Sequence, residues 1–297
     1  MLNVASFFLT SFVLLRSTIQ LLRFHFSFFL LPVYLFALSQ LPLVNVTKAV
    51  IIFFILHLLV YPSSNGYNSY MDKDETPIGG LSAPLQPTQQ LFYVSVIMDF
   101  IAIIISLFVS GIFAVGILLY ILASRAYSYR GIRLKRFPVL GFLIVFVFQG
   151  VVIFFITYHG AHSGQTLNVP LLPCVISSLL IGALYPLTQI YQHEEDKKDG
   201  VTTISYLLGK KGTFVLSMIL FLSATTLMYF LFSKKEQLIF FYLFLAMLLP
   251  VVLFFLHWMK KVWQVEEEAN FKNSLMMNIL STSCTTAFFV TIIMLKH

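Results

Sequence analysis

The sequence predicts an all-α, polytopic membrane protein with nine transmembrane helices. Of its 297 residues, 59% are hydrophobic and only 10% are charged. Apolar stretches of about 20 residues, the length that crosses a bilayer as a helix, recur from one end of the chain to the other. The 32 Phe and 14 Tyr residues leave too little polar surface to solvate a globule of this size. These observations exclude a soluble domain.

Nine apolar segments are long enough to span the bilayer. The least distinct boundary lies near Ser110 and Gly111, because residues 92–126 are apolar without a polar loop. A single helix of that length would be about 50 Å long, more than a bilayer accommodates by tilting, so we expect two helices with a tight turn at Gly111. The predicted spans are 25–43, 46–63, 92–109, 110–126, 138–158, 170–190, 212–232, 237–258 and 274–295.

The amino-terminal segment, residues 1–24, is apolar but unlike a cleaved signal peptide. Its positive charges, Arg16 and Arg23, follow the apolar run, and no small-x-small cleavage site follows it. Its large apolar side chains recur at helical spacing, which predicts an amphipathic helix lying in the membrane interface. A single transmembrane domain over residues 25–297 would follow, and a tenth span is the alternative.

Basic residues are distributed unevenly between the predicted loops. With the amino terminus in the cytoplasm, fifteen of the nineteen Lys and Arg residues lie on the cytoplasmic side, as the positive-inside rule requires. This asymmetry supports nine spans, and a bacterial inner membrane is the expected location. The net charge of +7 is explained by topology and by anionic membrane lipid, so no nucleic-acid partner is expected.

Two short acidic loops, residues 65–75 and 192–200, hold seven of the twelve carboxylates. Each follows a predicted span, and a basic loop at residues 125–136 lies on the same side, which we expect to be cytoplasmic. Carboxylates bind Mg²⁺, and the metal and nearby cations neutralise a diphosphate as it leaves a substrate. An apolar helical bundle beneath these loops is suited to a lipid tail.

These motifs resemble those of the UbiA superfamily of intramembrane prenyltransferases. Residues 127–136, Tyr-Ser-Tyr-Arg-Gly-Ile-Arg-Leu-Lys-Arg, are similar to the Tyr-Ser-x-x-x-x-Arg-Leu-Lys segment of the family. Residues 196–203 resemble its Asp-Arg-x-x-Gly-x-x-Thr stretch. The likeness runs over nearly the whole chain from about Arg23. It implies a nine-helix UbiA-like bundle that uses Mg²⁺ to transfer an isoprenyl group from an isoprenyl diphosphate to a lipophilic acceptor, with aromatic acceptors among the candidates.

The first acidic motif departs from the family pattern, which is usually Asn-Asp-x-x-Asp-x-x-x-Asp. Anchoring the pattern on Asp72 places Ser64, Asn65 and Asn68 at the three preceding positions, so two expected aspartates are asparagines. A second register begins at Asn68, makes Asp72 the middle aspartate and puts Thr76 in the last position.

The second motif, usually Asp-x-x-x-Asp, has Gln192 and Asp196 at those positions. In the register anchored on Asp72, each motif therefore keeps its last carboxylate and carries amides before it. An amide oxygen can ligate Mg²⁺ but adds no negative charge, on which Mg²⁺ affinity depends. We expect nearby carboxylates to compensate, and the candidates are Asp74, Glu75, Glu195 and Asp199.

The resemblance implies roles for the candidate site residues. Asp72 and Asp196 would hold Mg²⁺ against the diphosphate, with Glu75 and Asp199 as further metal ligands. Neutral ligands or hydrogen-bond partners would come from the three amides, Asn65, Asn68 and Gln192. The diphosphate would be bound by basic residues beside a tyrosine at the cavity mouth: Arg133 and Lys135, with Lys73 and Lys197 behind them, and Tyr127.

One further departure keeps three functions open. Where the family commonly has Arg-Pro after the first motif, this chain has Gly79 and Gly80, so a cation that would contact phosphate is missing. The first hypothesis is a prenyltransferase. The second is a related terpene cyclase or another lipid-modifying enzyme, and the third is a non-catalytic membrane protein that keeps the fold.

Asp99 is the one acid placed well inside a predicted span, 92–109. A carboxylate is costly in hydrocarbon, so we expect it to face the bundle interior or a wet cavity. His57 on the preceding predicted span is a plausible partner. A neutral structural pair, or an interfacial position for Asp99, is an equally simple interpretation.

Overall fold

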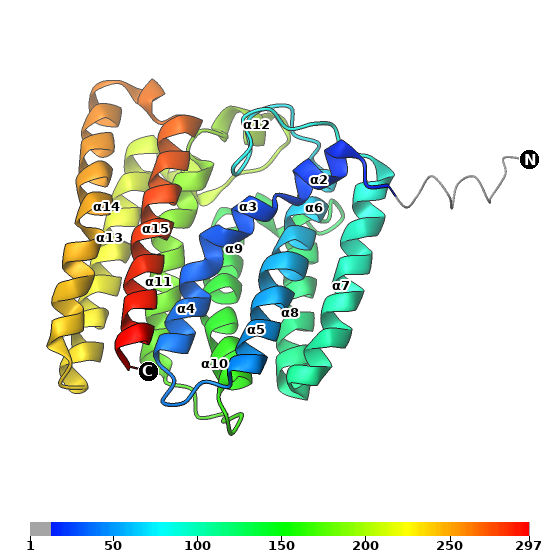
Figure 1. Cartoon of the computed structure of the whole chain (residues 1–297). Helices are drawn as coiled ribbons and strands as arrows, with labels where there is room; N and C mark the ends of the chain where they lie inside the picture. The colour runs from blue at the N-terminus through cyan, green and yellow to red at the C-terminus, as the bar shows by residue number, and fades with distance from the viewer. Residues whose placement is uncertain (1–12, 297) are drawn as a thin grey trace, which may run out of the picture.

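The computed structural model describes residues 13–296, and this part of the chain folds into a helical bundle with isolated bridges in place of strands (Figure 1). The predicted all-α class is confirmed, and nine helical segments of the described chain are long and apolar enough to cross a membrane. Their bounds are Arg16–Ser39, Val46–Asp72, Gln89–Val109, Gly111–Ser128, Pro138–Ala161, Leu171–Gln189, Ile204–Lys234, Leu238–Gln264 and Phe271–Lys296.

The first span begins earlier than predicted and is broken near one end. It consists of α2 (Arg16–Leu22), α3 (Phe24–Ser27), η1 (Phe28–Leu30) and α4 (Leu31–Ser39). The break falls at Arg23, whose φ of 48° is left-handed, so that α2 turns away from the line of α4 (Figure 1). Within α2, Leu21 and Leu22 are buried against α6 and α7. Residues 1–12 of the predicted interfacial segment lie outside the described residues.

The second span corrects the prediction of a loop after residue 63. It continues through α5 (Val46–Phe54) and the π-helical η2 (Ile55–Val60) into α6 (Tyr61–Asp72). Most of the first acidic motif is therefore helical, because its amides and hydroxyls face a polar cavity inside the bundle and are not exposed to lipid. The helix ends where Lys73 adopts a left-handed conformation and donates its N–H to the Ser69 carbonyl.

The predicted turn within the apolar run 92–126 is confirmed. Helix α7 (Gln89–Val109) is separated from α8 (Gly111–Ser128) by a single extended residue, Ser110. The Ser110 hydroxyl accepts the Phe113 N–H and caps α8, so the reversal needs no polar loop. After the basic loop and η3 (Leu134–Arg136), the fifth span comprises α9 (Pro138–Val145), η4 (Phe146–Val152) and α10 (Ile153–Ala161).

Helix α11 (Leu171–Gln189) lies at the centre of the bundle, where it packs against α13, α15, α4 and η4. The second acidic motif follows it and includes the short helix α12 (His193–Lys198). The remaining spans are α13 (Ile204–Lys234), which is kinked at Gly209, α14 (Leu238–Gln264) and α15 (Phe271–Lys296). They lie together at one side of the bundle (Figure 1).

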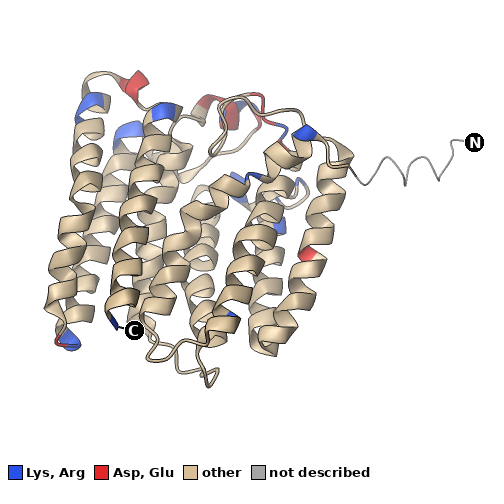
Figure 2. Cartoon of the chain, viewed as in Figure 1, with Lys and Arg blue, Asp and Glu red and all other residues tan. Residues whose placement is uncertain are grey.

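The charged residues gather at the two ends of the bundle and leave its belt largely apolar (Figure 2). We call the end that carries Asp72 and Asp196 the motif face. Most of the ribbon coloured for charged residues lies at this face, at the end of the apolar belt (Figure 2). This distribution, with nine apolar spans, makes the chain an integral membrane protein.

Asp99 faces the bundle interior, but the predicted partner is wrong. Its carboxylate forms an ion pair with Arg125 of α8 and accepts a hydrogen bond from Ser63 of α6. His57 instead lies 3.1 Å through Nδ1 from the Ser27 carbonyl. Ser63 and His57 are six residues apart, which places them on different faces of their helix, so only one of them meets α7. The Asp99 cluster joins the second, third and fourth spans.

Candidate functional site

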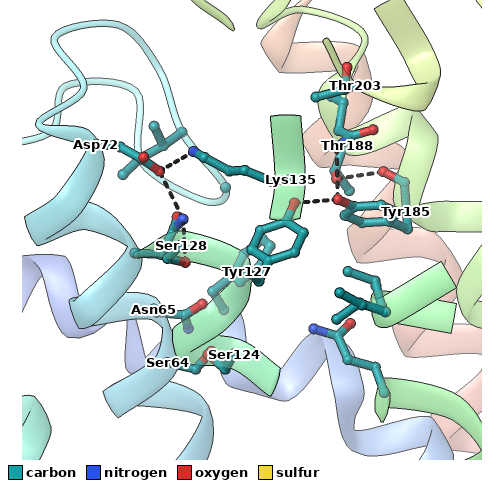
Figure 3. Close-up of a pocket in the computed structure, with 18 of the residues that line it drawn as sticks. Ser64, Asn65, Asp72, Ser124, Tyr127, Ser128, Lys135, Tyr185, Thr188 and Thr203 are labelled. Carbon is teal, nitrogen blue, oxygen red and sulfur yellow. Dashed lines mark hydrogen bonds and ion pairs between the residues drawn. The ribbon is translucent and has the colours of Figure 1, made fainter. Parts of the chain in front are cut away.

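A cavity of about 190 Å³ lies beneath the motif face, between α6, α8, α11, α12 and the fifth span. Polar side chains from both motifs and from the basic loop line its outer part (Figure 3). Toward the membrane interior, Tyr120, Ile144, Val145 and Phe148 line it with largely apolar surface. The cavity is therefore charged where it meets the motif face and largely apolar toward the membrane interior.

One face of α6 supplies the first motif to this cavity. Asn65, Asn68 and Asp72 are spaced three and four residues apart, so they lie on one side of a helix with 3.6 residues per turn, and all three line the cavity. Ser69 and Thr76, which the alternative register requires, do not line it. The helical phase thus favours the register anchored on Asp72.

Asp72 is the most highly contacted carboxylate of the site. Its side chain is 5% exposed and forms an ion pair with Lys135, at 2.5 Å between Oδ2 and Nζ. The Asn68 amide donates to the same oxygen at 2.8 Å, and an Arg133 nitrogen lies 3.5 Å from Oδ1. Oδ1 accepts no hydrogen bond from residues 13–296. The carboxylate is therefore held in place while one oxygen is available to a ligand.

Two further carboxylates, Asp196 and Asp74, line the same cavity. Burial raises the pKa of Asp196 to about 7, with Lys135 opposing the shift and Asp72 and Asp74 adding to it. Burial likewise raises the pKa of Asp74 to about 6, and the charge of Asp72 contributes. Lys135 opposes both shifts and Arg23 opposes that of Asp74, but these charges do not offset the burial of the two acids. A cation bound in the cavity would favour their ionised forms.

The other predicted acidic and basic residues lie outside this cavity. Partial burial favours the protonated form of Asp199, but its ion pairs with Arg133 and Arg130 outweigh that effect and lower its pKa. Of the four candidates for the compensating charge, Asp74 lines the cavity as its third carboxylate, whereas Glu75, Glu195 and Asp199 do not line it. Three predicted residues are exposed and do not line the cavity: Lys73, Glu75 and Lys197.

The basic loop between the motifs connects them directly. Arg133 forms ion pairs with both Asp72 and Asp199, and its φ of 50° places it at a left-handed turn. Lys135, two residues later, lines the cavity and contacts Asp72. The Arg-Leu-Lys spacing therefore puts Arg133 between the two motifs and Lys135 in the lining of the cavity.

Several of the described cavity residues were not predicted from the sequence, and among them Arg23 is the one that carries a charge. Its side chain donates to the Asn65 carbonyl at 3.2 Å and approaches the Gly79 carbonyl at 3.5 Å, and the residue is 6% exposed. It forms no salt bridge within the described part of the chain. A Cβ at Gly79 would come within 2.7 Å of the Phe26 ring and 3.2 Å of this guanidinium, so glycine leaves the room that Arg23 occupies.

A positive charge after an apolar stretch is typical of membrane-flanking residues, and this is why Arg23 was overlooked. The sequence held one indication of such a residue. Gly79 and Gly80 stand where the family commonly has Arg-Pro, so a cation at this position would have to come from another segment of the chain.

Aromatic rings and amides form the wall opposite α6. The Tyr127 and Tyr185 hydroxyls are hydrogen-bonded to each other, and Gln189 donates to Tyr185 at 2.8 Å (Figure 3). Gln192 lines the cavity and donates to the Pro77 carbonyl at 3.4 Å. Ring faces at this wall can stabilise a carbocation formed nearby.

The donor set fits Mg²⁺ when a diphosphate shares the coordination. No three His, Cys, Asp or Glu side chains of residues 13–296 form a cluster that could enclose a metal by themselves. Mg²⁺ is commonly held by one or two carboxylates together with substrate phosphates and water, and an all-protein cage is not needed. Asp72 and Asp196, with the Asn68 amide, meet that requirement.

The fold and the cavity together define an intramembrane protein whose two acidic motifs and basic loop meet at one membrane face. The model of the UbiA prenyltransferase family matches residues 26–281, and the chain belongs to this family. The predicted family is confirmed. No curated protein sequence matches the chain significantly.

Solved structures show the same architecture. A UbiA homologue from Archaeoglobus fulgidus, bound to DMAPP and Mg²⁺, is 17% identical with a TM-score of 0.70, and the match covers 94% of this chain and 99% of that one. An apo UbiA homologue from Aeropyrum pernix K1 is 18% identical with a TM-score of 0.67, covering 90% and 97%. A digeranylgeranylglyceryl phosphate synthase structure is 19% identical with a TM-score of 0.61, covering 94% and 98%. These likenesses establish the shared fold.

Proposed function

We propose that the protein transfers an isoprenyl group from an isoprenyl diphosphate to a lipophilic acceptor within the membrane, and that it uses Mg²⁺. The observation that carries this proposal is the convergence of Asp72, Asp196 and Lys135 in one cavity above an apolar floor. The structure of the Archaeoglobus fulgidus homologue with DMAPP and Mg²⁺ supports it.

The amide substitutions are compatible with this activity. Asp74 enters the cavity beside Asp72 and Asp196, so three carboxylates face the position of the metal and the diphosphate. Arg23 supplies a buried cation near Gly79, where a basic side chain was missing from the motif. Asp74 thereby supplies one carboxylate in place of the three replaced by amides, and Arg23 supplies the missing cation.

Binding and ionisation follow from this arrangement. Asp72 and Asp196, assisted by Asn68 and Gln192, would hold the metal and through it the diphosphate. Mg²⁺, when bound, neutralises charge on the phosphate oxygens. Lys135 and Arg23 line the same cavity and would stabilise the negative charge that grows on the diphosphate oxygens as the carbon–oxygen bond breaks.

The electron pair of that bond leaves with the diphosphate, and an allylic cation remains in the apolar part of the cavity. The rings of Tyr127 and Tyr185, which line the cavity, would stabilise the cation. An electron-rich carbon or oxygen of the acceptor then attacks the cation, and the acceptor loses a proton. The buried floor excludes water, which would otherwise capture the cation.

We further propose that the motif face is cytoplasmic and that the protein resides in a bacterial inner membrane. Fifteen of its nineteen basic residues belong to segments at this side of the spans. The positive-inside rule favours that orientation.

The test uses purified protein in nanodiscs with Mg²⁺, isoprenyl diphosphates of several lengths and a membrane extract as the source of acceptor. We expect release of diphosphate and formation of a prenylated lipid. Asp72→Ala and Asp196→Ala should abolish both, whereas Lys197→Ala, an exposed residue of the same short helix as Asp196, should change them little.

Other results of this assay would change the proposed activity or contradict it. Release of diphosphate without any acceptor would replace the transferase by a cyclase or hydrolase. Release of diphosphate that does not depend on Mg²⁺, and that is the same in both aspartate variants as in the parent protein, would contradict the proposal. Saturable binding of the donor without turnover, whichever acceptor is present, would also contradict it.

A further inference from the structure

A second cavity, of about 400 Å³, lies in the carboxy-terminal half of the bundle. It is enclosed by the first span, α11, α13, α14 and α15. Its walls are formed by Leu, Ile, Val, Phe and Met side chains, and none of the described residues that line it is charged or a histidine. A ligand with a net charge would lose its hydration here without compensation, so the cavity selects for neutral molecules.

Two of the buried hydroxyls in this lining lack a hydrogen-bond partner among the described residues. Ser217 of α13 is 2% exposed and Ser281 of α15 is 4% exposed, and neither Oγ has a hydrogen-bond partner among residues 13–296. Other hydroxyls of the same lining do bond to their own helices: Ser177 donates to the Pro173 carbonyl, and Thr285 donates to the Ser281 carbonyl. Buried polar groups are rarely left unpaired, so the two serines indicate a polar partner inside the cavity.

The two serines lie at similar depth on helices that run in the same direction. Ser217 is eight residues beyond the kink at Gly209, and Ser281 is ten residues beyond the start of α15 at Phe271. At 1.5 Å per residue, both lie about 12–15 Å below the motif face. This depth is inside the hydrocarbon layer, beyond the reach of a phospholipid headgroup.

The cavity borders both the bilayer and the first cavity. Leu222 of α13 lines it and is also exposed on the outer surface of the bundle, as are Leu245 and Leu256 of α14, so at these side chains the cavity wall is itself in contact with lipid. Phe26 lines the first cavity and Phe29 the second, and their rings pack edge to face with centroids 5.0 Å apart. This aromatic pair forms part of the wall between the two cavities.

We propose that the second cavity is a binding site for a neutral lipid. The hydrocarbon chain of this lipid packs against the apolar walls, and its single hydroxyl or carbonyl oxygen forms hydrogen bonds with Ser217 and Ser281. The site is separate from the diphosphate cavity and does not depend on catalysis there.

The test measures binding of two probes of similar size to the purified full-length protein in detergent. Farnesol carries one hydroxyl, and farnesene is a hydrocarbon without it. Saturable, ligand-dependent increases in the thermal unfolding midpoint report the affinity of each. We expect farnesol to bind more tightly than farnesene. Ser217→Ala and Ser281→Ala should each lower the affinity for farnesol by about five- to tenfold, which corresponds to about 1–1.4 kcal/mol. Farnesene should bind all variants equally.

The matched control is Ser223→Ala. This serine lies on α13 as well, is half-buried, does not line the cavity, and donates to the Ile219 carbonyl. Its replacement should leave both affinities unchanged. The cavity variants should fold well, because alanine removes a buried hydroxyl that lacks a partner; their midpoints without ligand should equal or exceed that of the parent protein.

Four results would overturn the proposal. The first is the absence of saturable stabilisation by farnesol. The second is equal affinity for both probes in the parent protein. The third is a preference for farnesol that survives in the Ser217→Ala/Ser281→Ala double variant. Displacement of farnesol by an anionic phospholipid, and not by a neutral prenyl alcohol, would likewise contradict a neutral ligand.

Discussion

Replacing Asp196 by asparagine should stabilise the metal-free protein at pH 8. Burial and neighbouring carboxylates raise the pKa of Asp196 from 3.8 to about 7. Each pKa unit corresponds to about 1.36 kcal/mol, so ionising this side chain in the folded protein costs up to about 4 kcal/mol. The side chain keeps some contact with solvent, and we expect a gain of about 2–4 kcal/mol in the free energy of unfolding when asparagine removes the charge.

The sign of the pH dependence follows from the direction of the shift. Between about pH 4 and pH 7 the folded protein retains a proton on Asp196 that the unfolded chain has lost. The stability of the parent protein therefore falls as the pH rises through this window, and the full penalty is present above pH 7. The asparagine variant lacks this contribution, so the difference between the two proteins should vanish near pH 4.

The assay is thermal unfolding of both proteins in detergent with EDTA, from pH 4 to pH 8. The expected gain corresponds to an increase of about 4–8 °C in the midpoint at pH 8. Mg²⁺ with an isoprenyl diphosphate should raise the unfolding midpoint of the parent protein and leave the midpoint of the asparagine variant unchanged. Glu194→Gln is the control, because Glu194 is exposed on the same short helix and does not line the cavity. Equal midpoints at pH 8, or a difference that grows toward low pH, would refute the reasoning.

Three other substitutions test separate parts of the structure. Lys135→Ala should lower kcat/KM for the donor at least 100-fold, about 3 kcal/mol, because the leaving diphosphate loses a cation, whereas the exposed Lys73→Ala should change turnover less than threefold. Asp99→Asn should destabilise the fold by about 3–5 kcal/mol, measured as a lower unfolding midpoint, because it leaves a buried arginine unpaired. Gly150→Ala should cost at least about 2 kcal/mol in the same assay, because its Cβ would overlap the backbone of α11, while Gly111→Ala, with open space around it, should be nearly neutral.

Much of the site was accessible from residue patterns because its motifs are local. Asn65, Asn68 and Asp72 share one helix face, and Tyr127 and Lys135 belong to one short segment, so all five enter the cavity together. The compensating carboxylate could not be chosen in this way. The other three candidates, Glu75, Glu195 and Asp199, also lie within three residues of a retained aspartate. Only the path of the loop in the folded protein places Asp74, and not these three, in the cavity.

The cationic lining was harder to predict for a different reason. Arg23 is 42 residues from Asn65 along the chain, and its contact depends on how α2 and α3 cross the end of α6. The partner of Asp99 was also mispredicted, because the choice between Arg125 and His57 depends on the rotation of the second span. Pairings between helices are set by their packing, and no pattern within one helix reports them.

The sequence by itself determined that this chain is a nine-span membrane protein with two separated polar motifs, because hydrocarbon thickness dictates both the length and the composition of every span. Only the tertiary structure decided which charged groups share a cavity, that the first motif is helical, and that a second, uncharged cavity holds two unpaired serines. These features depend on helix phase and on contacts between distant segments. Hydropathy carries no information about either.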